Sequence, residues 1–238
     1  MDMEHLQYPD KEATLIFSFA GTLENKMAEN MDDFGHLWTA LKNMTVENLD
    51  LIRKINEYEH QVPAGPKVSV SLVICNFMKN IIVVKDPHLT SGKLDSREPW
   101  PTYIEPSSVA LLYSRKKSWD ARGSVGLTVI TVQYDLRLYS FAVHWHECFD
   151  FNLFENSFAV FPLPGQEYSS EDATKTFKDF IDYSNLGNIE EKYVGIRGFA
   201  KDGPKAIEYH GMLISVKMGV SHNDTMQLSI LPLDHNHK

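Results

Sequence analysis

The sequence predicts a mainly β protein, in which a β-sandwich follows an acidic helical leader. From Lys67 onward, apolar residues recur at every second position, as in Val68, Val70 and Leu72, and this is the period of a half-buried strand. Further short apolar runs follow with turn-rich stretches between them, and so many consecutive strands indicate a sandwich or barrel. The runs span residues 80–85, 108–114, 124–134, 138–146, 157–163, 193–200, 206–218 and 226–231.

Residues 1–66 are predicted to be a separate helical leader. Leu49, Ile52 and Ile55 recur at three-residue spacing within a candidate helix that begins near Thr45. The segment 63–66, Pro-Ala-Gly-Pro, ends this helix and forms a natural hinge. Residues 1–60 hold 5 basic and 12 acidic side chains, a net charge of −7. An amphipathic helix hides its apolar stripe from water, so we expect the stripe to pack on the sandwich.

Residues 67–238 are predicted to form the sandwich domain, interrupted by one helix. Ser169-Ser-Glu-Asp172 resembles a capping box, the sequence signature of a helix start. Ala173, Phe177 and Phe180 then recur at helical spacing and form an apolar stripe. The fold class expected from these patterns, with the family resemblance described below, is a ten-stranded antiparallel β-sandwich flanked by two helices.

Charge and cysteine usage exclude several function classes. The net charge of −9 argues against nucleic acid as a partner, because binding to phosphates needs clustered Lys and Arg. Cys75 and Cys148 lie in apolar runs, where a lone cysteine behaves as a small buried hydrophobe, so no disulfide framework is expected. The charged N-terminus does not resemble a signal peptide, so we expect a soluble protein, cytoplasmic or non-classically released, that acts at a membrane surface.

The sequence contains no catalytic constellation. A Gly-rich phosphate loop, a nucleophile elbow and an HExxH motif are all missing. His144 and His146 lie two positions apart, so on a strand both point to one face, but two histidines do not close a metal site. We therefore expect a protein that is not an enzyme and that uses neither a cofactor nor a metal.

Aromatic residues are the unusual feature of the chain. Phe151, Phe154 and Phe158 lie in one aromatic stretch, while Trp100 and Trp119 lie in loops. One interpretation is core packing, which is the usual fate of such runs. The other is an interface, with Trp100, Trp119, Phe151 and Phe158 as candidates for contact with a membrane. A protein partner suits such a surface equally well.

Three linked motifs resemble a known family in their order and spacing. They are Ala110-Leu-Leu-Tyr-Ser114, Arg122-Gly-Ser-Val-Gly126 and Phe149-Asp-Phe-Asn-Leu-Phe-Glu-Asn-Ser-Phe-Ala-Val160. They resemble the actinoporins, the pore-forming cytolysins of sea anemones, and their vertebrate relatives. The resemblance covers roughly half of the chain and leaves residues 1–60 largely outside it. It implies a ten-stranded sandwich with two helices, which agrees with the periods described above.

The resemblance also implies a site for a lipid headgroup and a mode of action. It implies membrane docking through aromatic residues that hold phosphocholine, followed by oligomerisation into a pore. By motif, the headgroup-binding residues are Ser91, Leu127, Phe154 and Phe177. Ser157 stands where the family has a Trp, and losing that ring removes a cation–π contact worth roughly 0.5 to 2 kcal/mol. Phosphocholine binding is therefore expected to be weak.

Two functions remain open from the sequence. One is a membrane phospholipid-binding protein, with oligomerisation and pore formation on membranes as a further step. The other is a soluble β-sandwich module that has lost the phosphocholine site and recognises a protein or glycan partner. A shared fold does not choose between them, because function depends on sites.

Overall fold

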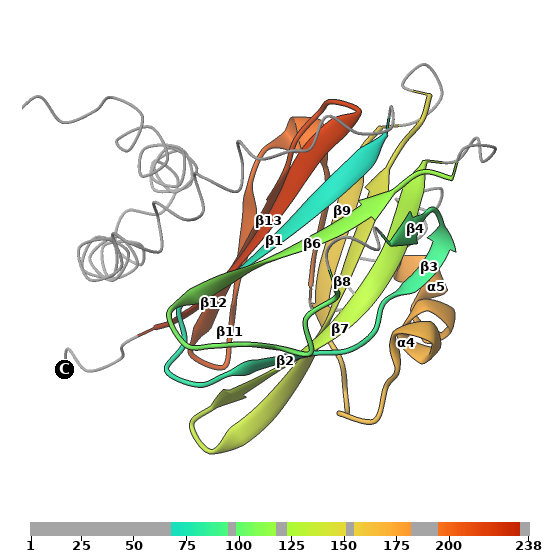
Figure 1. Ribbon diagram of the computed structural model, residues 1–238. Helices are drawn as coiled ribbons and strands as arrows, with labels where there is room; N and C mark the ends of the chain where they lie inside the picture. Colours follow the sequence, from blue (N-terminus) through green and yellow to red (C-terminus); the bar gives the residue numbers. More distant parts are fainter. Residues whose placement is uncertain (1–67, 95–98, 118–122, 151–154, 182–194, 234–238) are drawn as a thin grey trace, which may run out of the picture.

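Two β-sheets packed face to face form the molecule, with two short helices on the outside of one sheet (Figure 1). The computed structural model describes residues 68–94, 99–117, 123–150, 155–181 and 195–233. The predicted leader and its hinge at 63–66 lie outside these residues. The predicted β-sandwich is confirmed.

Sheet A has the strand order β11-β12-β13-β1-β6-β4. Neighbouring strands are antiparallel except β1 and β13, which pair in parallel from Ser69 opposite Asn223 to Asn76 opposite Ile230. The strands are β1 (Ser69–Asn76), β4 (Lys93–Leu94), β6 (Ser108–Arg115), β11 (Lys205–Tyr209), β12 (Met212–Met218) and β13 (Asn223–Pro232).

Sheet B has the order β10-β9-β8-β7-β2-β5, and β3 also pairs with β7. All of its pairs are antiparallel. The strands are β2 (Ile82–Val84), β3 (His88–Ser91), β5 (Tyr103–Ile104), β7 (Ser124–Tyr134), β8 (Arg137–Glu147), β9 (Ser157–Pro162) and β10 (Ile196–Phe199).

The expectation of ten antiparallel strands is wrong in two details. The described residues form thirteen strands. Short strands such as β4 and β5 could not be predicted, because they have too few residues to show a period. The run predicted at 206–218 is two strands, since His210 and Gly211 adopt positive φ angles of 49° and 76° and turn the chain between β11 and β12. The parallel pair joins the first and last described strands, so the chain between them forms the crossover that parallel pairing requires.

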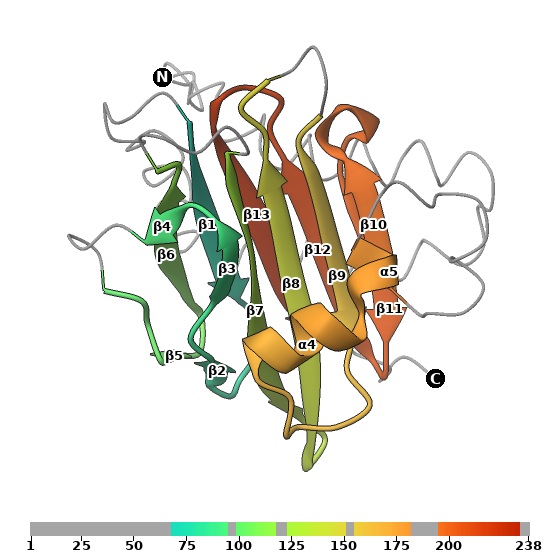
Figure 2. The ribbon, with the colours of Figure 1, turned by 90° about the vertical axis from the view of Figure 1, so that its right-hand side faces the viewer.

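The predicted helix near residue 169 is confirmed as α4 (Ser170–Thr176), and α5 (Lys178–Ile181) follows it. The Ser169 hydroxyl accepts a hydrogen bond from the Asp172 backbone N–H at 3.0 Å, which caps the helix. Figure 2 shows both helices lying across the outer face of sheet B. Phe177 and Phe180 pack there against Phe161, with ring centroids 4.9 Å apart in both pairs. A short 3₁₀ helix, η2 (Ala200–Asp202), follows β10.

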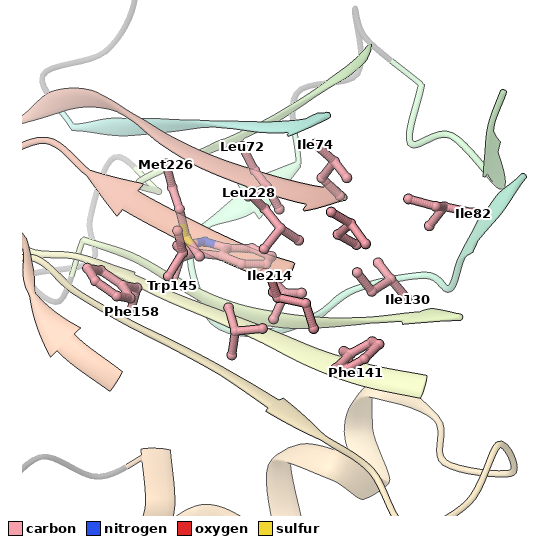
Figure 3. Packing of buried hydrophobic residues seen from close by; sticks show 14 of the residues in the cluster. Leu72, Ile74, Ile82, Ile130, Phe141, Trp145, Phe158, Ile214, Met226 and Leu228 are labelled. Carbon is pink, nitrogen blue, oxygen red and sulfur yellow. The ribbon is translucent and has the colours of Figure 1, made fainter. Parts of the chain in front are cut away.

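The core lies between the two sheets and is built from the inward-facing residues of both. Trp145 and Phe158 on sheet B are fully buried and meet aliphatic side chains from sheet A (Figure 3). Burying each large apolar side chain stabilises the fold by roughly 1.5 to 3 kcal/mol. The labelled sheet A partners are Leu72, Ile74, Ile214, Met226 and Leu228.

Two glycines of the 122–126 motif have structural reasons for their positions. Gly123 has a φ of +92°, and a Cβ there would collide with the Glu147 carbonyl oxygen. Gly126 lies opposite Trp145, and a Cβ there would come within 2.5 Å of the indole ring. This part of the motif therefore serves the packing of β7 against β8.

Candidate functional site

The two ends of the sandwich differ in composition, and each carries a candidate site. We call the end where β6, β8 and β12 finish the loop end, and the opposite end, at the β7–β8 turn, the hairpin end (Figure 1). At the loop end, the Ser69 N–H donates to the His222 carbonyl at 2.9 Å, and the Lys116 N–H donates to the Val68 carbonyl at 3.0 Å. The start of β1 thus joins both neighbouring connections.

Asn156 holds the loop end together. Its side chain is 1% exposed, and its Oδ1 accepts from the Cys148 N–H at 3.0 Å. Its Nδ2 donates to the carbonyls of Gly219 at 3.2 Å and Ser221 at 2.9 Å. One side chain thereby joins the β8–β9 connection to the β12–β13 turn. The sequence did not indicate this role, because two of the partners, Gly219 and Ser221, lie more than sixty residues away along the chain.

The loop-end surface, defined here as Lys116, Phe149, Val220 and His222, combines apolar and basic groups. Phe149 and Val220 are 40% and 63% exposed. The Lys116 Nζ lies 4.3 Å from the centroid of the Phe149 ring, a cation–π arrangement. The His222 Nε2 lies 3.0 Å from the Phe149 carbonyl oxygen. An exposed ring beside an ammonium group is the combination that suits the headgroup region of a bilayer.

Glu147 is buried beneath this end of the sandwich. Its side chain has no exposed surface, and neither carboxyl oxygen has a hydrogen-bond partner of ordinary geometry among the described residues. Burial, and to a smaller extent the nearby Asp224, raise the pKa of Glu147 to about 10, and the Asn156 side chain only partly offsets these two effects. The carboxyl group is therefore protonated at neutral pH.

The structure brings two of the predicted headgroup residues together. Leu127 and Phe177 belong to one apolar cluster between the outer face of sheet B and α4, and they are 0% and 7% exposed. Ser91 is also buried, and its hydroxyl donates to the Gly123 carbonyl at 3.0 Å. In this conformation these side chains fill the protein interior. Phe154 lies outside the described residues.

The predicted membrane-interface residues that the structure describes are not exposed on one surface. Phe158 lies wholly in the core, so its ring has no exposed face to offer a membrane. Trp100 is half-buried; its ring centroid lies 6.1 Å from that of Trp145, and its Nε1 donates to the Lys85 carbonyl at 3.2 Å. Trp119 and Phe151 lie outside the described residues.

His144 and His146 do lie on one face of β8, as their spacing predicts. Burial, and to a smaller extent the neighbouring His146, lower the pKa of His144 to about 3. Within the described ranges, no group of three or more His, Cys, Asp and Glu side chains is placed to hold a metal ion. The two histidines thus lack a third ligand there.

The hairpin end carries an apolar patch. Five of the exposed large hydrophobic side chains lie there, on the turn and along the outer face of sheet B: Ile81, Val83, Tyr103, Leu136 and Leu138. Val83 and Tyr103 are paired across β2 and β5. Leu136 is 93% exposed and has a φ of 61°, a backbone conformation that costs a leucine roughly 1 to 2 kcal/mol.

Beside this patch is a groove of about 520 Å³. Tyr139 and Tyr209 contribute aromatic rings to it, and Gln166 and Glu167 contribute polar groups. The Gln166 amide donates to the Leu138 carbonyl at 3.4 Å, which joins the loop after β9 to β8. A groove of this size with a few polar groups has the dimensions of a small-molecule site.

Comparison with known proteins finds a similar fold but does not assign the chain to a sequence family. No family model matches the chain, and no curated protein matches it in sequence. The solved structure of the lipid binding protein Nakanori is similar, with a TM-score of 0.54 and 13% identity over 86% of this chain and 93% of its own. The two proteins therefore share a β-sandwich fold.

Two further structures are more distant. The Xerocomus chrysenteron lectin XCL has a TM-score of 0.41 and 8% identity over 69% of this chain and 97% of its own. IP-1A from Alcaligenes faecalis has a TM-score of 0.38 and 12% identity over 70% of this chain and 91% of its own. At these scores the two similarities carry no argument about function. The described segments hold no helix with the length and apolar composition needed to cross a bilayer.

Proposed function

We propose that this protein binds membrane phospholipid through the loop-end surface and acts without catalysis. The observation that carries the proposal is the exposed Phe149 ring with the Lys116 ammonium group 4.3 Å from its centroid. Burying an exposed aromatic ring at a bilayer surface is favourable, and an adjacent cation adds attraction to lipid phosphates. The fold shared with the lipid binding protein Nakanori supports this class of function.

The proposed contact is adsorption to the bilayer surface. Leu127 and Phe177 are buried, so they leave little surface for a choline group in this conformation. We therefore propose that phosphocholine is recognised weakly and that the apolar and basic groups of the loop end supply most of the affinity. Oligomerisation and pore formation, which the actinoporin resemblance implies, are a further step. Dye leakage from liposomes measures that step separately.

The test is co-sedimentation with phosphatidylcholine vesicles, with and without phosphatidylserine. The double variant Phe149→Ala/Val220→Ser removes the exposed apolar groups of the loop end and is expected to lower binding about tenfold. The control is Leu136→Ser, which removes an apolar side chain that is 93% exposed, more than either Phe149 or Val220, from the hairpin end. The control is expected to bind as the parent does.

A second candidate function follows from the groove at the hairpin end. Aromatic rings of Tyr139 and Tyr209 beside Gln166 and Glu167 offer stacking faces and hydrogen-bonding groups, as recognition of a glycan or a peptide requires. If the parent protein does not sediment with either kind of vesicle, membrane binding is excluded and this soluble-module interpretation takes its place. If the loop-end variant and the control lose binding equally, the loop end is not the contact surface.

A further inference from the structure

The outer face of sheet A is buried, although no described element covers it. All eight residues of β1 are buried, on both faces of the strand. Leu72 and Ile74 point into the core, so Val73 and Cys75 point outward, yet both are 0% exposed. A sheet face in contact with water shows exposed residues at alternate positions. Another surface therefore covers this face.

The composition of this face is largely apolar. One cluster is formed by Val73 and Cys75 with Phe77, Val109 and Leu111. A second cluster lies beside it, formed by Leu213, Leu231 and Leu233 with Phe77 and Ala206. The described helices α4 and α5 lie on the opposite side of the molecule, on sheet B (Figure 2). Both clusters thus need a partner from outside the described elements.

Polar residues on the same face are also buried. Tyr113 and Gln227 alternate with core residues of β6 and β13 and are each 2% exposed. The charged side chains that strand alternation places on this face within β1, β6, β12 and β13 are Arg115 and Lys217. The covering surface should therefore be apolar in its centre and acidic at its edge.

We propose that residues 46–60 of this chain's own leader cover the face as an amphipathic helix. Their stripe of Leu49, Ile52 and Ile55 supplies the apolar centre. The leader's net charge of −7 complements Arg115 and Lys217. This inference does not depend on lipid binding.

The length of the chain allows this arrangement. Fifteen helical residues are roughly 22 Å long, and the eight residues of β1 span roughly 26 Å, so the two elements match. The eight residues 61–68 reach at most about 27 Å, which is enough to bring the end of the helix back to the start of β1. Because the leader is attached next to this face, its effective concentration there is high compared with that of a separate molecule.

The first experiment measures how fast a maleimide modifies Cys75 and Cys148 in the full-length protein. Cys75 faces the covered surface, and Cys148 is buried at the loop end and serves as the internal reference. In the double variant Leu49→Lys/Ile52→Lys the helix loses its stripe, so labelling of Cys75 should be about tenfold faster than in the parent, with Cys148 unchanged. The control Asp50→Asn/Glu57→Gln raises the net charge equally, from the other side of the helix, and should label as the parent does.

A second measurement tests the proposal even if the lysine variant fails to fold. A photo-crosslinking amino acid placed at Leu49 in the otherwise unchanged chain is expected to join β1, β6, β12 or β13 of the same molecule. Crosslinks to sheet B, or crosslinks only between two isotopically distinguished copies, would overturn the proposal. Unchanged labelling of Cys75 in a folded lysine variant would overturn it as well.

Discussion

The connections between strands are stabilised differently at the loop end and at the hairpin end. At the loop end, the buried side chain of Asn156 supports the connections, and the carboxyl group of Glu147 is also buried there. At the hairpin end, β7 and β8 are joined by the tight turn at Asp135 and Leu136, both with positive φ, and apolar side chains are exposed around it. The unfavourable contribution to the free energy of folding comes from desolvation of polar groups at the loop end and from backbone strain at the hairpin end.

The largest expected difference between the two ends is the loss of stability when an asparagine side chain is removed from each. Asn156→Ala should lower the free energy of unfolding by about 3 kcal/mol, because the Cys148 N–H and two carbonyl groups lose their partner in a buried place. Asn80→Ala at the hairpin end removes an exposed hydrogen bond to the Gln133 carbonyl and should cost about 0.5 kcal/mol. Urea unfolding measures both. Equal losses would show that Asn156 does not hold the loop end together.

The next effect is a dependence of stability on pH. Native Glu147 keeps its proton up to about pH 10, while the unfolded chain loses it near the ordinary pKa of 4.5, so stability falls as pH rises through this interval. Native His144 stays neutral down to about pH 3, while the unfolded chain gains a proton below 6.5, so stability falls as pH drops below 6.5. The two contributions cancel between pH 4.5 and 6.5, where this pair gives a flat maximum.

Glu147→Gln tests this balance. The substitution should raise the free energy of unfolding at pH 8 by about 3 kcal/mol more than it does at pH 5.5, because the unfolded chain then no longer gains by ionising this side chain. At pH 5.5 the gain should be smaller, since the parent's unfolded carboxyl gains less from ionising there. Urea unfolding at the two pH values gives the comparison. A gain that is the same at both would mean that Glu147 is ionised in the native protein.

The smallest expected effect is at the hairpin turn. Leu136→Gly should stabilise the protein by about 1 kcal/mol, because glycine adopts a φ of 61° without the strain that leucine suffers. Leu138→Gly, two residues later in β8, should instead destabilise it, since a glycine in a strand costs conformational entropy. Thermal unfolding of the two variants decides the point. If Leu136→Gly is no more stable than the parent, the exposed leucine is held by contacts that offset the strain.

Much of the fold was predictable because strand and helix periods are local properties. The run predicted at 124–134 coincides with β7, and the one at 108–114 with β6 to within one residue. The Ser169 cap was also evident, since a cap and its partner lie three residues apart. The interpretation of Phe158 as core could be drawn from the same pattern, but the pattern did not distinguish it from an interface.

The tertiary structure decided which strands became neighbours and which side chains became buried. Nothing local places β1 beside β13, or Asn156 beside Gly219 and Ser221, because these contacts join residues far apart in the chain. Leu127 and Phe177 match the family motif, yet only the packing of α4 on sheet B shows that they are covered. The sequence by itself determined the elements, since the period of apolar residues sets them. Pairing and burial were decided in three dimensions, because they depend on the free energy of the whole assembled sandwich.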